Sequence, residues 1–231
     1  MIKHEFGQYY LNNLYRGMVA QRYGMETAID KTPVKSDLYL SFEGLDGDQC
    51  ADQRHHGGRD RALHQYPLEH YSYWQKSYKK AVSWLAPGMG ENLSAEGMTE
   101  DNVYLGDRFQ WGEAIIEVSQ PRSPCYKLNK RWGIDTISTD MQATSRCGWL
   151  YRVIQQGMVS VNEPLKLIER PYNARTIREI CEMFFGDPLS TDKLTQLSEQ
   201  KALSDSWKQK VELRLVTAKV ENWRFRLLGH A

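Results

Sequence analysis

Short segments that alternate apolar and polar residues, each ended by a turn, fill the first 170 residues and constrain the fold more than any other feature. Leu38, Leu40 and Phe42, for example, alternate with their neighbours as in a strand with one buried face. The expected strands are 14–22, 34–42, 103–105, 108–111, 114–120, 158–161 and 164–169. Many short strands with regular turns predict a mainly β fold with added helices, closed or semi-closed into a barrel.

One helix is expected to interrupt the strands. Pro67 suits the first turn of a helix, and Pro87 followed by Gly88 would end it. The apolar residues between them recur at helical spacing and are Tyr71, Trp74, Tyr78, Val82 and Leu85. A second, weaker helix is predicted at about 135–144.

The pattern changes to helical periodicity after Arg170. Thr176 and Glu179 have the spacing of a capping box, which predicts the start of a helix. The apolar residues that follow at helical spacing are Ile177, Ile180, Cys181 and Phe184. Two further short helices are expected at 191–203 and 204–216.

We therefore divide the chain into a β-barrel domain, 1–171, and a C-terminal three-helix module, 172–231. The whole chain has 30 Lys and Arg against 29 Asp and Glu. A protein that binds nucleic acid by neutralising phosphates is usually far more basic. Three helices could form a DNA-binding domain, and 13 Tyr and 7 Trp could stack on single-stranded bases, but no basic stripe accompanies them. We expect a small-molecule site and no stable nucleic-acid binding.

The cellular location follows from two absences in the sequence. Residues 1–11 lack the apolar core of a signal peptide, and no run approaches the roughly 18 apolar residues that span a bilayer. We therefore expect a cytoplasmic protein with no membrane partner. Thiols stay reduced in that compartment.

Of the four cysteines, Cys125 has the most distinctive surroundings. It directly follows Pro124, in a stretch that also contains Pro121, and the two prolines predict a stiff, extended loop. Arg122 and Lys127 would favour the thiolate, which is a nucleophile or a soft metal ligand. The same stretch would also suit a buried cysteine in a turn. Covalent catalysis with a histidine base is a further alternative, but it needs an oxyanion hole and an orienting acid that the sequence does not indicate.

A second candidate site is the loop around His56, Gly57 and Gly58. Adjacent glycines let backbone N–H groups approach an anion, and the arginines nearby add positive charge. The loop could equally be a simple glycine turn with solvated arginines. Zinc is a weaker alternative, because the neighbouring histidines and Cys50 show neither paired ligand spacing nor H-E-x-x-H.

Seven short motifs in the same order resemble those of MOSC-domain proteins, and within them the YiiM subgroup. The resemblance covers about 20–170 as MOSC domain and 172–220 as the three-helix module of the subgroup. The motifs are Thr27-Ala-Ile-Asp-Lys-Thr-Pro-Val34, Gly44-Leu-Asp-Gly-Asp48, His56-Gly-Gly-Arg-Asp-Arg-Ala62, Gly90-Glu-Asn-Leu93, Leu105-Gly-Asp-Arg-Phe109, Pro121-Arg-Ser-Pro-Cys125 and Gly148-Trp149.

The resemblance implies a barrel-like fold that binds the molybdenum cofactor, molybdopterin carrying molybdenum, with Cys125 as the metal ligand. It also implies that Lys31 and Thr32 hold the cofactor phosphate and that Asn92 contributes to the site. We expect Arg122, Ser123 and the loop at Gly57 and Gly58 to converge on the same pocket as cofactor-binding residues.

The subgroup implies an oxidoreductase that reduces N-hydroxylated compounds, such as the base analogue 6-hydroxylaminopurine, to amines and so detoxifies them. A separate flavoprotein reductase would supply the electrons, since no amino-acid side chain can carry an electron pair. His56 and Asp60 are the candidate proton donors. The alternative function is a carrier that binds the cofactor and delivers sulfur or metal without turnover.

Overall fold

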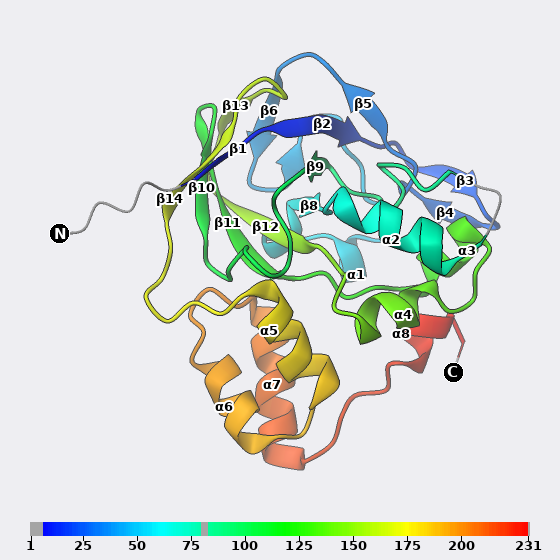
Figure 1. The fold of residues 1–231 in the computed structure, drawn as a ribbon, viewed down its shortest axis with the longest axis vertical. Coiled ribbons are helices and arrows are strands. Elements are labelled where there is room, and N and C mark those ends of the chain that lie inside the picture. The colour runs from blue at the N-terminus through cyan, green and yellow to red at the C-terminus, as the bar shows by residue number, and fades with distance from the viewer. Residues whose placement is uncertain (1–6, 80–82, 231) are drawn as a thin grey trace.

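The computed structural model describes residues 7–79 and 83–230, which form a curled sheet with helices on two sides (Figure 1). The strands are β1 (Gln8–Tyr9), β2 (Leu11–Arg16), β3 (Ala20–Arg22), β4 (Met25–Thr27), β5 (Thr32–Val34), β6 (Leu38–Ser41), β7 (Gly44–Leu45), β8 (Leu63–Gln65), β9 (Leu93–Ala95), β10 (Arg108–Trp111), β11 (Ala114–Pro121), β12 (Trp149–Gln155), β13 (Gly157–Val159) and β14 (Leu165–Glu169). The helices are α1 (Gln53–His56), the 3-10 turn η1 (Arg59–Arg61), α2 (Glu69–Ser77), α3 (Tyr126–Trp132), α4 (Ile137–Ala143), α5 (Ile177–Cys181), the π-helical turn η2 (Glu182–Gly186), α6 (Thr191–Ser198), α7 (Asp205–Thr217) and α8 (Arg224–Leu228).

Nine strands form the main sheet in the order β1-β14-β10-β11-β12-β8-β9-β2-β5. All neighbours are antiparallel except β8 and β9, which pair in parallel. A three-stranded sheet, β13-β6-β7, and a β3-β4 hairpin complete the strands. The sheet curls without joining β1 to β5, so the predicted mainly β fold is confirmed in its semi-closed form, a half-barrel.

Three predicted strands are wrong in detail. The strand expected at 14–22 is interrupted because Gly17 and Val19 donate their N–H groups to the side chains of Asp48 and Gln49, at 2.7 and 2.8 Å, rather than to a strand. The strand expected at 34–42 is two separate strands, β5 and β6. The strand expected at 103–105 is reduced to one bridge between Tyr104 and Thr176.

The first predicted helix is shorter than expected. It ends at Ser77, and Tyr78 takes an extended conformation. Tyr78 and Trp84 stack with ring centroids 5.6 Å apart, and Trp84 stacks on Trp132 at 3.9 Å. This long-range aromatic stack makes an extended chain more favourable than a longer helix. Val82, expected on the helix, lies outside the described residues.

The C-terminal helices share one apolar core with the sheet. Their predicted buried residues all belong to the cluster that includes the sheet's Phe109, Ile116 and Tyr151, which confirms that the helices pack on the barrel. These residues are Ile177, Ile180, Phe184, Leu194, Leu197 and Trp207. A second, smaller cluster lies under α2, α3 and α4.

The chain after α7 returns to the first domain, which the sequence did not indicate. Figure 1 shows α8 beside α4 and apart from α6 and α7. The carbonyl of Leu227 in α8 accepts hydrogen bonds from Asn129 Nδ2 and Ser138 Oγ, at 2.9 and 2.8 Å. Helix α8 therefore packs against α3 and α4. None of the helices formed by the described residues is long and apolar enough to cross a membrane.

Candidate functional site

The centre of the candidate site is a pair of side chains from two distant loops. Cys125 caps α3 in an extended conformation, with φ of −137° and ψ of 164°, and is 6% exposed. Its Sγ lies 3.6 Å from Nε2 of His56, the last residue of α1. The structure thus brings together the two loops that the sequence singled out.

Asp52 lies beside the rings of both His55 and His56, and its two carboxylate oxygens are each 3.1 Å from Nδ1 of His55. It caps α1, where its carboxylate accepts from the His55 N–H at 3.1 Å, and Oδ2 also lies 3.6 Å from Nδ1 of His56. Burial raises the pKa of Asp52, but the hydrogen bonds from His55 and the charge of His56 outweigh it and hold the pKa below its usual range. Sequence reasoning missed Asp52, although its N-cap spacing to His55 was a usable signal.

The surroundings of Cys125 favour its thiolate. Burial raises the pKa of the thiol, but the hydrogen bond from His56 and the positive charges of His56 and Arg122 outweigh burial and lower the pKa to about 7. An ordinary cysteine has a pKa near 8.5. Cys125 is therefore partly a thiolate at neutral pH and suited to bind a soft metal or act as a nucleophile.

Two buried polar atoms near Cys125 have no hydrogen-bond partner among the described residues. They are Nη1 of Arg122 and Nε2 of His64. The Arg122 backbone is fixed by an N–H bond to the Gly148 carbonyl at 3.0 Å, directly after β11. Burial and the nearby charges of Arg122 and Lys31 hold the pKa of His64 well below its usual range. The charges of Arg122 and Lys31 therefore both lower the pKa of His64.

Lys31 and Asn92 meet at Asp48. Lys31 Nζ lies 2.5 Å from Asp48 Oδ1, and Asn92 Nδ2 donates to Asp48 Oδ2 at 2.8 Å. Asn92 Oδ1 also accepts from the backbone N–H of His64 at 3.1 Å. The network links the Lys31 and Asn92 positions to His64, whose ring is also in hydrogen-bonding contact with the backbone of Gly90 and Cys147. Asp48, which the sequence reasoning did not single out, neutralises the lysine.

The structure ties the remaining predicted cofactor residues less closely to the thiol. Thr32 is an exposed residue of β5, and its hydroxyl donates to the Arg16 carbonyl at 3.4 Å. Ser123 is half-buried on the loop before Cys125. The Gly57 N–H donates back to Gln53 at 3.1 Å.

Gly58 and Asp60 have structural roles in this loop. Gly58 has φ of 101° and ψ of 159°, a region open essentially to glycine alone, and so allows the chain to turn into η1. The carboxylate of Asp60 pairs with Arg152 at 2.7 Å, and its carbonyl accepts from Ser119 at 2.6 Å. These contacts tie Asp60 to the sheet, whereas His56 faces the thiol.

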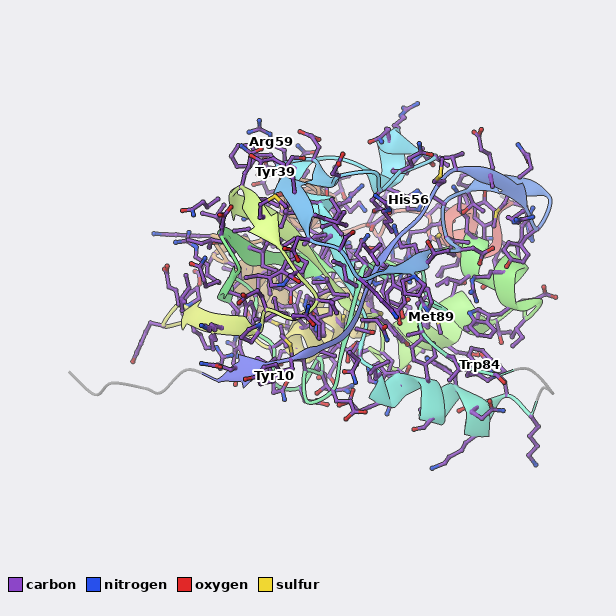
Figure 2. The ribbon with its side chains drawn as sticks, turned by 90° about the horizontal axis from the view of Figure 1, so that it is seen from above. Tyr10, Tyr39, His56, Arg59, Trp84 and Met89 are labelled. Carbon is purple, nitrogen blue, oxygen red and sulfur yellow. The ribbon has the colours of Figure 1, made fainter. Side chains whose placement is uncertain are left out.

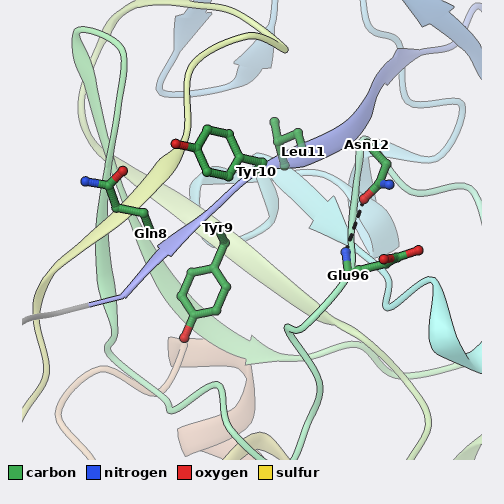
Figure 3. Close-up of a pocket in the computed structure, with 6 residues that line it drawn as sticks. All are labelled: Gln8, Tyr9, Tyr10, Leu11, Asn12 and Glu96. Carbon is green, nitrogen blue, oxygen red and sulfur yellow. Dashed lines mark hydrogen bonds between the residues drawn. The ribbon is translucent and has the colours of Figure 1, made fainter.

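Two surface hollows are lined by other residues. One, of about 320 Å³, lies along β1 and the start of β2 beside Glu96 (Figure 3), and the other lies between Tyr104 and α6. In Figure 2, Tyr10 of the first hollow lies well apart from His56. No set of three His, Cys, Asp or Glu side chains in the described ranges is placed to hold a metal ion by itself. The candidate site is therefore defined by the Cys125–His56 pair and the unpartnered atoms near it.

Comparison with known proteins identifies the family to which the chain belongs. A family model described as MOSC domain matches residues 52–166, and one described as YiiM-like, 3-alpha helix domain, matches 176–218. Protein YiiM of Escherichia coli (strain K12) is 44% identical over 94% of this chain and 97% of that protein. The crystal structure of YiiM from Escherichia coli has a TM-score of 0.84 at 40% identity, covering 96% of this chain and 100% of that one.

A more distant relative has an enzymatic name. A protein of Gibberella moniliformis (strain M3125 / FGSC 7600) called Reductase is 31% identical over 75% of this chain, which corresponds to 31% of that longer protein. The two family matches, the close YiiM relative and the shared fold all agree. The chain belongs to the MOSC-domain family, among the members that carry the YiiM-like three-helix domain.

Proposed function

We propose that the protein is a molybdenum-cofactor-dependent oxidoreductase that reduces N-hydroxylated compounds, 6-hydroxylaminopurine among them, to amines. The observation that carries the proposal is the Cys125 thiol, whose pKa is about 7 and which lies 3.6 Å from His56. Membership of the MOSC family and the relative called Reductase support it. A reduced thiol suits a protein that works in the cytoplasm.

The residues around Cys125 fit such a cofactor. A buried polar atom without a partner costs about 1–3 kcal/mol, so Arg122 Nη1, which has none among the described residues, indicates a polar ligand. Arg122, with the Lys31–Asp48–Asn92 network, would hold the phosphate of the cofactor, and Cys125 would bind its molybdenum. Thr32, Ser123 and the Gly57–Gly58 turn are proposed to line the same site. When bound, the cofactor supplies the two-electron chemistry that side chains lack.

The side chains supply and place a proton. Reduction of an N-hydroxyl group takes two electrons and two protons: the N–O bond breaks, one N–H bond and one O–H bond form, and water leaves. A flavoprotein reductase is the proposed electron donor. We assign proton delivery to His56, because Nε2 faces the thiol while Asp52 faces Nδ1. Its side chain is 41% exposed and can regain a proton from solvent. Asp60 is the weaker candidate because it pairs with Arg152.

The test is turnover of 6-hydroxylaminopurine by cofactor-loaded protein with a flavoprotein reductase. Cys125→Ser should lower turnover on the order of 100-fold or more, because serine is a harder and poorer donor to molybdenum. Cys50→Ser, which changes a half-buried cysteine, is the control and should keep wild-type turnover. Wild-type turnover by Cys125→Ser would contradict the ligand role. Tight pterin binding without turnover would instead favour the carrier function.

A further inference from the structure

A second group of cations lies between the Cys125–His56 pair and the C-terminal helices. The Arg61 guanidinium donates to the carbonyl of His55 and to Ser206 Oγ in α7, the latter at 3.1 Å. The Arg226 guanidinium of α8 donates to the carbonyl of Pro124. Each arginine is thus bonded to the carbonyl immediately before one member of the pair.

Lys210 joins this group from α7. It follows Ser206 by four residues, which puts both on one face of the helix. Burial lowers the pKa of Lys210, and the charges of Arg226 and Arg61 add to that effect while Glu221 opposes it. Lys210 Nζ makes no hydrogen bond or ion pair with any residue in 7–79 or 83–230. The Arg61 bond to Ser206, one helical turn from Lys210, and the effect of both arginine charges on Lys210 place the three cations in one region of the structure.

The acids that act on this cluster already have other partners: Asp60, whose charge acts on Arg61, pairs with Arg152 at 2.7 Å. The partners of Arg61 and Arg226 are neutral: two carbonyls, Ser206 and Gln142. Glu221 is the acid that raises the pKa of Lys210. Its carboxylate already accepts hydrogen bonds from Arg214 at 2.8 and 3.0 Å and from Trp223 at 3.0 Å. Like charges packed together in a half-buried position favour the binding of an anion.

We propose that Arg61, Lys210 and Arg226 form a phosphate-binding site beside Cys125, and that the substrates are N-hydroxylated nucleotides, whose phosphate binds there while the base reaches the thiol. This inference rests on the proposed function for the identity of the base. Arg226 and Lys210 belong to the C-terminal helices, and Arg226 lies beyond the residues matched by either family model. The helical module thereby gains a role in substrate binding.

The test compares ligands on the cofactor-loaded protein by calorimetry. Adenosine 5′-monophosphate should bind about tenfold more tightly than adenosine, a difference of about 1.4 kcal/mol. Lys210→Gln should remove this advantage. The matched control is Lys208→Gln on the same helix, whose ammonium donates to the Lys201 carbonyl at 2.9 Å, and it should keep the advantage. Equal binding of the two ligands by the wild type, or an unchanged advantage in Lys210→Gln, would overturn the proposal.

A second measurement separates the source of the phosphate. Inorganic phosphate should raise the melting temperature of the wild type and of Lys208→Gln above that in chloride of equal ionic strength, but not that of Lys210→Gln. If Lys210→Gln instead loses bound pterin, and the nucleotide shows no advantage in the wild type, the cations hold the cofactor phosphate and the nucleotide assignment is wrong. Neither binding experiment needs turnover. A protein that binds the nucleotide through Lys210 but reduces no N-hydroxyl group would contradict only the proposed function.

Discussion

Two arginines show how differently the helical module and the Cys125 region are built. Arg214 in α7 is 1% exposed, and it donates to the Phe184 carbonyl at 2.7 Å and to both oxygens of Glu221. Its guanidinium also lies 3.7 Å from the centre of the Phe184 ring. Arg122 beside Cys125, in contrast, has a buried Nη1 without a partner in the described part of the chain. The first arginine completes the fold, whereas the second keeps a donor atom that no described residue uses.

Removing the helical module should produce the largest effect. A protein ending at Arg170 would expose the apolar side of the sheet that Ile177, Phe184 and Trp207 cover. It would also leave the Ser119 carbonyl without the Ser204 N–H that it accepts at 3.0 Å. We expect this protein to aggregate, which soluble yield and size-exclusion chromatography would measure. A monomer as heat-stable as the full chain would show that the barrel does not need the module.

The two arginines themselves provide the next prediction. Arg214→Met should lower the free energy of unfolding by about 3–5 kcal/mol, because it leaves the carboxylate of Glu221 without its buried partner. Arg122→Met removes an unpaired cation and should change stability by less than about 1 kcal/mol. It should instead weaken cofactor binding by on the order of 10-fold or more, the loss of one charge-assisted hydrogen bond.

Urea denaturation and pterin fluorescence after oxidation measure the two effects separately. Arg214→Met should lose stability and keep cofactor binding, whereas Arg122→Met should keep its stability and lose cofactor binding. Equal loss of stability in both variants would show that Arg122 is structural. Normal cofactor content in Arg122→Met would remove it from the proposed phosphate site.

The features that sequence reasoning predicted well depend on neighbouring residues. The capping box of Thr176 and Glu179 is present, with both of its hydrogen bonds, because its geometry involves only four consecutive residues. The apolar stripe that follows it packs as its spacing predicts. Helix α3, in contrast, was missed because its polar sequence buries only Leu128 and Asn129, too few residues to show a period.

The features that were missed depend on contacts between distant parts of the chain. The loops of His56 and Cys125 were each singled out, but only the fold shows that the two side chains, 69 residues apart, are in contact. Asp48 and Asp52 are ordinary acids in the sequence and gain their roles from Lys31 and His56. The return of α8 to the Cys125 loop depends on the Arg226 contact with Pro124, 102 residues away.

The pH dependence of Cys125 sharpens the difference between the reactive region and the structural one. The pKa of about 7 means that the thiolate forms as pH rises through 7, so the alkylation rate of the protein without cofactor should be half-maximal near pH 7. Asp52→Asn removes the carboxylate beside His56 and should move the midpoint upward. Cys50→Ser serves as the background for both measurements, since Cys50 is only half-buried.

The matched control for Asp52→Asn is Asp37→Asn, which changes an exposed acid and should leave the midpoint at about 7. A midpoint near the ordinary cysteine value of about 8.5 in the Cys50→Ser background itself would contradict activation by His56. If Asp52→Asn also leaves the midpoint unchanged, Asp52 only caps α1.

The smallest expected effects come from the two cysteines that belong to the core. Cys147 donates from Sγ to the Met141 carbonyl at 3.3 Å, and the hydrogen bond with Cys147, together with burial, raises the pKa of Cys181 well above its usual range. Both thiols are fully buried, and the raised pKa keeps Cys181 protonated at neutral pH. Serine at either position replaces a sulfur with a smaller, more polar oxygen and should lower the free energy of unfolding by about 1 kcal/mol. Turnover and cofactor content should remain at wild-type levels, in contrast to Cys125→Ser. A large loss of turnover in Cys147→Ser, at unchanged stability, would mean that Cys147 takes part in the reaction and is not only a core residue.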